Sequence, residues 1–382
     1  MKKKSKKIKI ELDEKISFNY SKPKKIRKFK RNKRYKNKDN SLIFRYFLII
    51  LVLLLIISSF LYLFQKKMSI NYWFKSSKNN IVEPYIKAQK DFCENNNKYI
   101  NEKYEKEIIL VDAKINELTF KIYIFKAHGF IISAFKTDGA YEITISKYII
   151  EALLFYSSKK HIKNNKDILI LDIGANIGWY PSLLGRYGYT ILSFEAFEKN
   201  NYVAKKNYCY LNKDSNVIII TKGLSSQEKK CQYFTNLNNA GNGMIICNNN
   251  NNIKSKSLSR LFIEDSEVEL TTLKTFMPYL SDKNIALMKI DIEGYEYKAL
   301  IGGKELITKY HVPFIVLEFS PSFLKEVGSD PREFAQFFVN NGYKISLNGF
   351  LSKDFITVDK LLKKAGFQIN TYFIHESMLK LF

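Results

Sequence analysis

The most constraining feature of the sequence is an alternation of short apolar runs with longer segments of helical pattern between residues 168 and 320. The apolar runs are as short and as continuously hydrophobic as strands that are buried on both faces. They cover residues 168–174, 190–196, 216–221, 285–293 and 314–320. The helical segments cover residues 178–188, 199–213, 270–280 and 296–310. Buried strands joined by helical crossovers predict a parallel sheet with helices on both faces.

Flanking segments extend this α/β pattern. The segments 332–347 and 370–377 predict a further helix and two more strands, so the expected sheet is mostly parallel and seven-stranded. Upstream, residues 108–113 and 118–125 predict a β-hairpin, and residues 139–158 predict a helix. The asparagine-rich run "CNNNNNIKSK", residues 247–256, predicts a solvated loop insertion. We therefore expect a Rossmann-like α/β fold that is preceded by a small hairpin region.

An uncharged apolar stretch, "YFLIILVLLLIISSFLYLF" at residues 46–64, predicts a membrane anchor. As a helix it would extend about 28 Å, close to the hydrocarbon thickness of a bilayer. The apolar part of a cleaved signal peptide is usually shorter and is followed by small residues, whereas this run ends in Leu, Phe, Gln and Lys. The pattern therefore favours a single uncleaved transmembrane helix over a signal peptide or a buried core helix.

The charge is distributed unevenly around that stretch. The whole chain carries a formal net charge of +25, and residues 1–45 contain 19 Lys or Arg against 4 Asp or Glu. Residues 65–84 contain only four basic residues. The positive-inside rule then predicts a single-pass type II membrane protein with a cytosolic N-terminus. The expected organisation is a basic cytosolic tail (1–45), a signal anchor (46–64), a polar stem (65–105) and a catalytic domain (106–382), which faces the lumen of the Golgi or the endoplasmic reticulum.

This topology also bears on the partners of the chain. A basic tail can bind nucleic acid, but here the tail and the folded domain would lie on opposite sides of the membrane, and the tail has few aromatic residues to stack on bases. We therefore predict a lipid bilayer as a partner, through residues 46–64, and no nucleic acid.

The chain has four cysteines, and they do not decide the compartment. Cys93, Cys209, Cys231 and Cys247 form no CxxC pattern, which disfavours a zinc site. Cys231 and Cys247 flank a loop, so a disulfide between them and a pair of unpaired buried thiols both remain open.

The segment "ILILDIGANIGWY", residues 168–180, has the features of a ligand-binding strand–turn–helix. The strand is followed by Asp172, and Gly174, Asn176 and Gly178 are spaced two apart. In open parallel sheets, ligands bind outside the carboxyl ends of the strands, where glycines let a ligand approach the backbone. The dinucleotide fingerprint GxGxxG is absent, and an acid suits a cationic ligand better than a pyrophosphate.

Glu195 ends the second predicted strand. A carboxylate at this place can accept hydrogen bonds from both hydroxyls of a ribose. The glycine loop and the acid together predict a cofactor that contains a nucleoside. The alternative is that these acids only cap helices.

A second group of acids follows the fourth strand. Lys289, Asp291 and Glu293 alternate along the chain and would share one face of a strand, and Glu318 lies at the matching end of the fifth strand. Carboxyls around one crevice can accept a proton, anchor hydroxyl groups or hold a divalent metal, which is conceivable here but is not predicted. The alternative is a Lys–Asp pair with acids that cap the next helix.

At these residues the chain resembles the FkbM-like methyltransferases, within the class I S-adenosylmethionine-dependent fold. The resemblance runs from about residue 108 to residue 343. It is carried by "GAYE" (139–142), "LDIGANIGWY" (171–180), "FEA" (194–196), "LMKIDIEGYEYKALIGG" (287–303) and "VLEFSP" (316–321). The family implies methyl transfer from S-adenosylmethionine, most often to a hydroxyl of a sugar or another natural product. One departure is Ala196, because the family usually has proline after the ribose-binding acid.

The resemblance also implies roles for single residues. Residues that line the cofactor would be Asp172, Gly174, Asn176 and Gly178, and Glu195 would hold the ribose. The family signature next to the reacting centre would include Asp291, Glu293 and Glu296.

The remaining roles are our own assignment. We expect Asp291 or Glu293 to be the catalytic base, since no histidine lies in these blocks. Glu142, Glu296 and Glu318 are expected to contact the acceptor.

These observations favour a membrane-anchored O-methyltransferase that acts on a hydroxyl of a glycan, a glycolipid or a similar acceptor. Two alternatives stay open. One is a methyltransferase that acts on a lipid or a protein, because acceptor pockets lie in variable loops. The other is an inactive, membrane-tethered binding domain, against which the presence of Asp172, Glu195, Asp291 and Glu293 argues.

Overall fold

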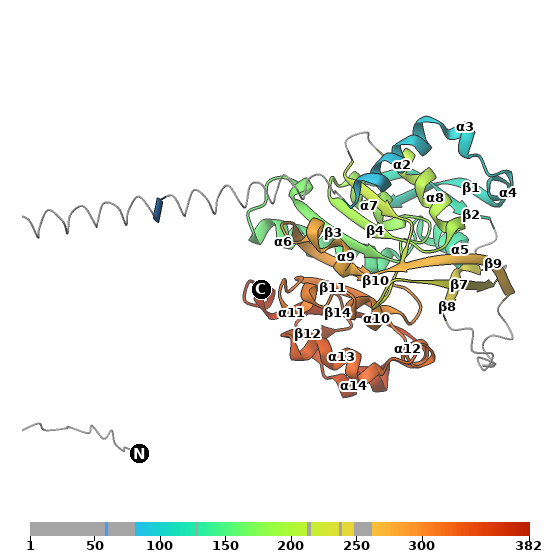
Figure 1. Cartoon of the computed structure of the whole chain (residues 1–382). Coiled ribbons are helices and arrows are strands. Elements are labelled where there is room, and N and C mark those ends of the chain that lie inside the picture. The colour runs from blue at the N-terminus through green and yellow to red at the C-terminus, as the bar shows by residue number, and fades with distance from the viewer. Residues whose placement is uncertain (1–57, 60–80, 127–128, 212–214, 237–238, 248–261) are drawn as a thin grey trace, which may run out of the picture. The chain divides into compact units, whose positions relative to one another are not determined.

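The computed structural model describes residues 58–59, 81–126, 129–211, 215–236, 239–247 and 262–382 (Figure 1). The chain divides into two compact units, Met1–Trp73 and Phe74–Phe382, and every element named below belongs to the second unit. The predicted tail (1–45), the first part of the stem (65–80) and the predicted anchor (46–64), apart from Ser58 and Ser59, lie outside the described residues. Within the described ranges, no helix combines the length and the apolar character that crossing a bilayer requires.

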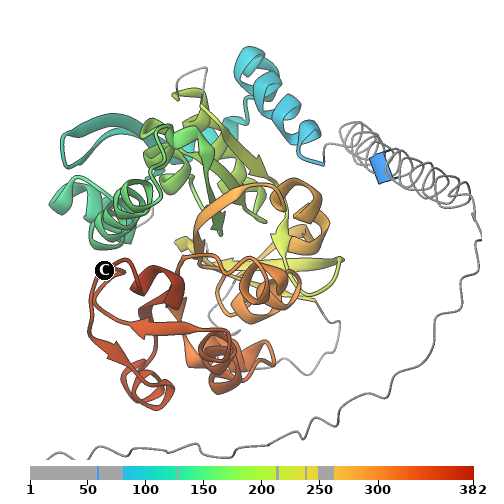
Figure 2. The ribbon, with the colours of Figure 1, turned by 90° about the vertical axis from the view of Figure 1, so that its left-hand side faces the viewer.

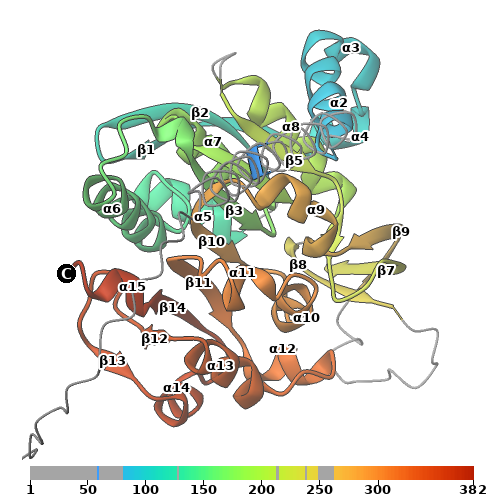
Figure 3. The same cartoon turned by 60° about the vertical axis from the view of Figure 1, so that its left-hand side comes forward.

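The core of the second unit is a mixed sheet of eight strands in the order β13-β12-β14-β11-β10-β3-β4-β5 (Figures 1 and 3). Neighbouring strands from β5 to β11 pair in parallel, whereas β14 runs antiparallel to β11 and β12. The strands are β3 (Ile168–Ile173), β4 (Thr190–Phe194), β5 (Val217–Ile220), β10 (Asn284–Ile290), β11 (Phe314–Phe319), β12 (Tyr343–Ser346), β13 (Phe355–Ile356) and β14 (Ile369–His375).

The predicted α/β class is confirmed, but the sheet is mixed and has eight strands instead of seven. The added strand, β13, has two residues, which is too short to produce a periodic pattern in the sequence.

Two apolar layers cover the two faces of the sheet, because side chains alternate along each strand. Ile168 and Ile170 belong to a cluster with α6, α7 and α8, whereas Leu169 and Leu171 belong to a cluster with α9, α10 and α13. Helices flank the sheet on both sides (Figure 2). They are α6 (Ile143–Lys159), α7 (Trp179–Arg186), α8 (Glu198–Cys209), α9 (Leu273–Leu280), α10 (Glu296–Ile301), α11 (Glu305–Thr308), α12 (Pro321–Glu326), α13 (Pro331–Asn340), α14 (Val358–Lys364) and α15 (Glu376–Leu379), with the 3-10 turn η1 at Asn165–Asp167.

The predicted hairpin is present. Strands β1 (Ile108–Ile115) and β2 (Leu118–Phe125) pair antiparallel, with Ile109 opposite Ile124. They are followed by α5 (Gly129–Asp138), and Ile131 of this helix is buried in the same apolar layer as α6 and α7.

A second sheet, with the order β6-β9-β7-β8, lies between the third and fourth strands of the parallel series along the chain and was not predicted. Its strands are β6 (Gly223–Leu224), β7 (Lys229–Asn236), β8 (Asn239–Ile246) and β9 (Phe262–Thr271). Polar residues and glycine are interspersed in β7 (KKCQYFTN) and β8 (NAGNGMII), so neither shows a clear alternation of apolar and polar residues. A Cys231–Cys247 disulfide joins β7 to the residue that follows β8. Of the two alternatives that the sequence left open for these cysteines, a disulfide or unpaired thiols, the structure has the disulfide.

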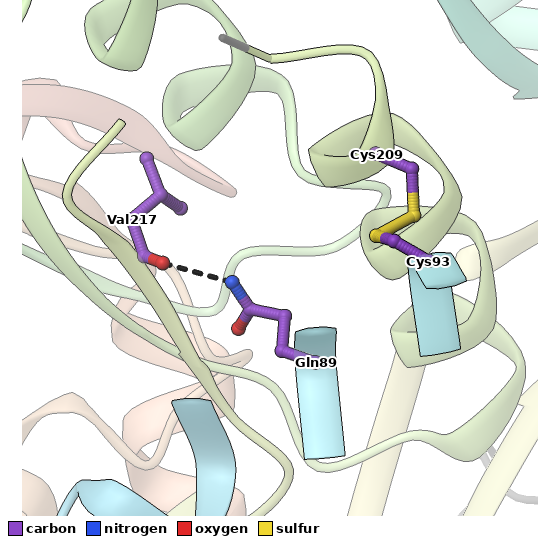
Figure 4. Close-up of a disulfide and its surroundings, with 4 residues drawn as sticks. All are labelled: Gln89, Cys93, Cys209 and Val217. Carbon is purple, nitrogen blue, oxygen red and sulfur yellow. Dashed lines mark hydrogen bonds between the residues drawn. A yellow bond between two sulfur atoms is a disulfide. The ribbon is translucent and has the colours of Figure 1, made fainter. Parts of the chain in front are cut away.

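Three helices precede the hairpin, α2 (Glu83–Glu94), α3 (Asn96–Tyr99) and α4 (Glu102–Glu107). The buried side chain of Gln89 donates a hydrogen bond to the carbonyl oxygen of Val217 (2.8 Å) and accepts one from the amide of Ile219 (2.9 Å). A disulfide joins Cys93 of α2 to Cys209 of α8 (Figure 4). Part of the predicted stem, residues 81–105, is thus joined to β5 by a buried amide and to α8 by a disulfide.

Candidate active site

A cavity of about 400 Å³ opens at the carboxyl ends of β3, β4, β10 and β11. This volume is in the usual range of sites for small molecules. Seven of the residues that the sequence predicted for a site line it, namely Glu142, Gly174, Asn176, Glu195, Asp291, Glu293 and Glu318. The other three, Asp172, Gly178 and Glu296, do not.

Glu195 lies in the wall of the cavity and is 8% exposed. Its carboxylate accepts hydrogen bonds from the backbone amides of Asn176 (2.7 Å) and Phe197 (2.9 Å). Burial raises the pKa of Glu195 to about 7, against the effect of these two amides. A carboxylate offers about four acceptor positions, so Glu195 keeps the capacity to bind hydroxyl groups of a ligand.

Two asparagine side chains in the same wall have buried oxygens that find no hydrogen-bond partner among the described residues. They are Oδ1 of Asn176 and Oδ1 of Asn200. A buried acceptor without a donor is costly, so these oxygens fit a ligand that presents N–H or O–H groups. Asn200 was not predicted, although its position five residues after Glu195, in the first turn of α8, places it at the same edge of the sheet.

The two glycines predicted for the cofactor loop have different roles. Gly174 lines the cavity with φ = +90°, and a Cβ atom there would lie 1.9 Å from the carbonyl oxygen of Asp291. Gly178 has φ = +81°, and a Cβ atom would lie 3.1 Å from Cα of Ala204 in α8. Gly178 therefore lets α7 begin against α8, and it takes no part in the cavity wall.

Asp172 is fully buried, behind the cavity wall. It accepts a hydrogen bond from the Ser193 hydroxyl (3.3 Å), and burial raises its pKa to about 6. The sheet register places Asp172 opposite Lys289 on β10. Asp172 is therefore a buried charge behind the site and is not exposed to the cavity.

Lys289 is the buried cation of this region, and its Nζ lies 3.1 Å from Oδ2 of Asp291. Burial acts against its charge, but Asp291, Glu142 and Asp172 outweigh that effect and raise the pKa of Lys289 above its ordinary value. The sequence analysis kept a Lys–Asp pair open as an alternative to a functional site, and this pair is present. Asp291 nevertheless also lines the cavity.

Asp291, Glu293 and Glu318 converge, as expected. One carboxylate oxygen from each lies within 4.8 Å of the others. Burial, followed by the charge of Asp291, raises the pKa of Glu318 to about 8 and that of Glu293 well above its ordinary value. Carboxyls with pKa values near neutrality can exchange a proton with a substrate. The same spacing would suit a divalent cation, of which the described residues give no further sign.

Glu142 and Glu296, both expected to contact the acceptor, differ in their surroundings. Glu142 lines the cavity, has φ = +45° and accepts a hydrogen bond from the Tyr180 hydroxyl (2.6 Å). Glu296 is buried away from the cavity and accepts hydrogen bonds from the amides of Ile292 (3.2 Å) and Gly294 (3.1 Å). Glu296 therefore holds the loop that carries Asp291 and Glu293, and is a positioning residue.

Two parts of the cavity wall were missed by the sequence analysis. Phe130 and Ile131 come from α5, and Tyr233 and Ile245 come from the second sheet. None of these residues belongs to a sequence motif. Each of them lines the cavity only through tertiary packing.

Residues 172–345 match the family model of the methyltransferase FkbM domain. Among solved structures, the bifunctional kinase-methyltransferase WbdD is 12% identical, with 60% of this chain and 38% of that chain covered and a TM-score of 0.35. A TehB-like S-adenosylmethionine-dependent methyltransferase from Corynebacterium glutamicum is 10% identical, with 64% and 94% covered and a TM-score of 0.32. Magnesium protoporphyrin IX methyltransferase from Synechocystis is 11% identical, with 60% and 82% covered and a TM-score of 0.27.

The aligned region thus spans less than half of the WbdD chain. No curated protein matches the sequence. The family assignment rests on the domain match, which contains both the glycine loop and the acidic loop of the cavity. Residues 172–345 thus match the methyltransferase FkbM domain, and this match covers the part of the chain that supplies both loops of the cavity.

Proposed function

We propose that this protein is a membrane-anchored, S-adenosylmethionine-dependent methyltransferase that methylates a hydroxyl of a glycan, a glycolipid or a similar acceptor. The observation that carries the proposal is the convergence of Asp291, Glu293 and Glu318 in the cavity that also contains Glu195. A group that can accept a proton and a group that can hold a ribose thus share one cavity, as O-methyl transfer requires.

The residues of the cavity fit the cofactor. Glu195, Asn176 and Asn200 provide buried acceptor oxygens for the hydroxyl and amino groups of S-adenosylmethionine. Bound S-adenosylmethionine would supply an electrophilic methyl group. The acceptor hydroxyl must lose its proton as the new carbon–oxygen bond forms, and we assign Asp291 or Glu293 as the base. Holding both reactants in one cavity also lowers the entropic cost of their encounter.

The exposed Phe130 ring at the cavity supports an acceptor with both apolar and hydroxyl-bearing surfaces. Phe130 lies on α5, is 84% exposed and lines the same cavity as the carboxyl groups. Binding sites commonly combine aromatic contact with a few convergent polar groups, and a sugar ring presents both kinds of surface. The same groups could also contact a hydroxyl on a lipid or a protein. The test below distinguishes these acceptors.

The state of the cysteines supports a lumenal or external location. Cys93 pairs with Cys209, Cys231 pairs with Cys247, and no cysteine of the chain is free. Disulfides persist mainly in oxidising compartments. Together with the apolar stretch at residues 46–64 and the basic residues before it, this pairing favours a type II orientation with residues 81–382 in the Golgi or the endoplasmic reticulum.

The activity is tested with the full-length protein in detergent and S-adenosylmethionine that carries a labelled methyl group. Panels of neutral oligosaccharides, glycolipids, simple lipids and proteins are offered as acceptors, and Glu195→Ala serves as the variant with an impaired cofactor site. We expect label in the carbohydrate fractions with the native protein only. Label found only in the lipid or protein fractions would show that the acceptor is a lipid or a protein instead of a carbohydrate. A folded protein that does not bind S-adenosylmethionine would be an inactive tethered domain.

The topology is tested on sealed microsomes with added protease. We expect residues 81–382 to resist digestion until detergent opens the vesicles. Digestion of this domain in intact vesicles would contradict the proposed orientation.

A further inference from the structure

The cavity can be divided by the strands that supply its wall. Glu195 and Asn200 follow β4, and Gly223 and Leu224 follow β5, so this half surrounds the acceptor oxygens that fit a nucleoside. Asp291 and Glu293 follow β10, Glu318 lies on β11 and Gln368 precedes β14. The sheet order reverses between β3 and β10, and ligands of open α/β sheets cross such a point. The half over β10 and β11 is therefore the acceptor half.

The ionisable side chains that line the acceptor half of the cavity are carboxyls. Five carboxyl residues line the whole cavity, and four of them belong to this half: Asp291, Glu293 and Glu318 by their strands, and Glu142 because it also shares a smaller pocket with Asp291 and Glu318. None of the described residues that line the cavity is Lys, Arg or His. Lys289 lines a smaller pocket together with Glu142, Asp291 and Glu318. Its ammonium group donates a hydrogen bond to Asp291, and it does not line the main cavity.

This arrangement has a direct consequence for a ligand. A phosphate, sulfate or carboxylate that enters the acceptor half would lose water and would meet no cation among the described lining residues. It would also lie beside Glu293 and Glu318, whose pKa values are raised by burial and then by the charge of Asp291, so that a further negative charge next to them would be unfavourable. A hydroxyl group, in contrast, can donate a hydrogen bond to a carboxylate or accept one from a protonated carboxyl.

We infer that the acceptor half of the cavity binds a hydroxyl-bearing group without negative charge and rejects acceptors that carry phosphate, sulfate or carboxylate next to the hydroxyl that is methylated. This inference rests on the proposed O-methyltransferase function and specifies its substrate class. It locates the selection at Glu142, Asp291, Glu293 and Glu318, because an anion would oppose the ionisation of these carboxyls and would find no cation among the described residues that line the cavity.

The test uses the full-length protein and matched acceptors that differ in one charged group. Methyl glucoside is paired with methyl glucuronide, methyl galactoside with methyl galacturonide, and a mannoside with its 6-phosphate. Transfer of labelled methyl is measured at one ionic strength, because salt screens charge effects. We expect each neutral acceptor to be methylated with a kcat/KM at least tenfold above that of its anionic partner.

A variant and a matched control test whether Glu318 causes the preference for neutral acceptors. Glu318→Gln keeps an acceptor oxygen for the Gln368 amide, which donates a hydrogen bond to Oε1 of Glu318 at 2.6 Å, but removes the carboxyl that ionises at a pKa of about 8. Transfer is therefore compared at a pH above that value. We expect the ratio of neutral to anionic transfer to fall severalfold in Glu318→Gln. Glu151 lies exposed on α6 and does not line the cavity, so Glu151→Gln should leave the ratio unchanged.

The outcomes separate this inference from the function on which it rests. Equal or faster transfer to the anionic partners would overturn the inference and leave the methyltransferase activity standing. Binding of S-adenosylmethionine, measured by calorimetry, without transfer to any member of the pairs would overturn both the inferred class and the glycan acceptor. Failure of the folded protein to bind S-adenosylmethionine would instead overturn the proposed function itself.

Discussion

The backbone of Gly174 packs directly on the carbonyl oxygen of Asp291, so the glycine loop after β3 and the acidic loop after β10 are in close contact. A Cβ atom on Gly174 would lie 1.9 Å from that oxygen, and the amide of Asp291 donates a hydrogen bond to the Ile173 carbonyl (2.9 Å). A displacement of the loop that fits the cofactor would therefore disturb the loop that carries the expected base.

Gly174→Ala should displace the Asp291 loop and destabilise the domain. Gly328→Ala is the matched control, because Gly328 has φ = +81° but no atom within 4 Å of the position that a Cβ would take. The control should cost about 1–2 kcal/mol from the left-handed backbone alone, and Gly174→Ala should add a further cost of about 1–3 kcal/mol or more from the steric overlap. Denaturant unfolding of both variants measures this difference, and equal losses would contradict the role of the contact.

Glu195→Ala should weaken the binding of S-adenosylmethionine by about 10-fold to 100-fold, since one or two charge-assisted hydrogen bonds would be lost. Calorimetric titration of the full-length protein measures the effect. Glu198→Ala, at an exposed acid three residues further along the chain, is the control and should bind the cofactor like the native protein. Cofactor binding that survives in Glu195→Ala would remove Glu195 from the binding site.

Asp291→Asn and Glu293→Gln should each bind S-adenosylmethionine, but at least one of them should lose about 10²-fold to 10⁴-fold in kcat, the usual contribution of a general base. The amide oxygen that replaces the Asp291 carboxylate can still accept the hydrogen bond from Lys289, so the fold should be kept. Single-turnover methyl transfer distinguishes the chemical step from product release. Full turnover in both variants would show that neither residue is the base.

The folded domain should lose stability as the pH rises from about 4 to about 8. Burial raises the pKa of Asp172 to about 6, that of Glu195 to about 7 and that of Glu318 to about 8. The folded state therefore holds these protons more tightly than the unfolded state, so the stabilisation is complete below the unfolded pKa values and is lost as the pH passes the folded ones.

Thermal unfolding between pH 5 and pH 8 measures this dependence. Glu318→Gln cannot take up the proton, so its melting temperature should fall less steeply with pH than that of the native protein or of Glu151→Gln. Parallel slopes in all three proteins would show that Glu318 does not contribute.

Replacing both Cys93 and Cys209 by serine should lower the free energy of unfolding by about 2–5 kcal/mol, the usual loss for a native disulfide. The two cysteines are 116 residues apart, so the bond constrains a long loop of the unfolded chain. The comparison is made by thermal unfolding, with the native protein in reductant as a second reference. An unchanged melting temperature would show that this bond is not formed in the protein.

The sequence was most informative where local pattern determines structure. The parallel strands and the convergence of Asp291, Glu293 and Glu318 follow from apolar runs that end in acids, because the carboxyl ends of parallel strands meet at one edge. The family blocks likewise located Glu195 in the cavity wall.

The sequence was less informative where tertiary packing decides. Glu296 and Gly178 belong to the motifs, but they stabilise the loops behind the cavity and do not line it. A sequence motif does not show whether a residue contacts the ligand or supports the loop that does. Gln89 and Cys93 lie in a polar segment without a strong pattern, and only the folded chain brings them to β5 and α8. The contribution of α5 to the cavity is missed for the same reason.

The contact between Gln89 and β5 has a consequence for self-association. An edge strand with unpaired amide and carbonyl groups is a template on which another chain can add a strand, and such edges promote aggregation. The Gln89 side chain occupies the Val217 carbonyl and the Ile219 amide as a neighbouring peptide group would. In the membrane-anchored enzyme that we propose, α2 would keep this edge from pairing with another copy. The disulfide at Cys93 would keep α2 in place.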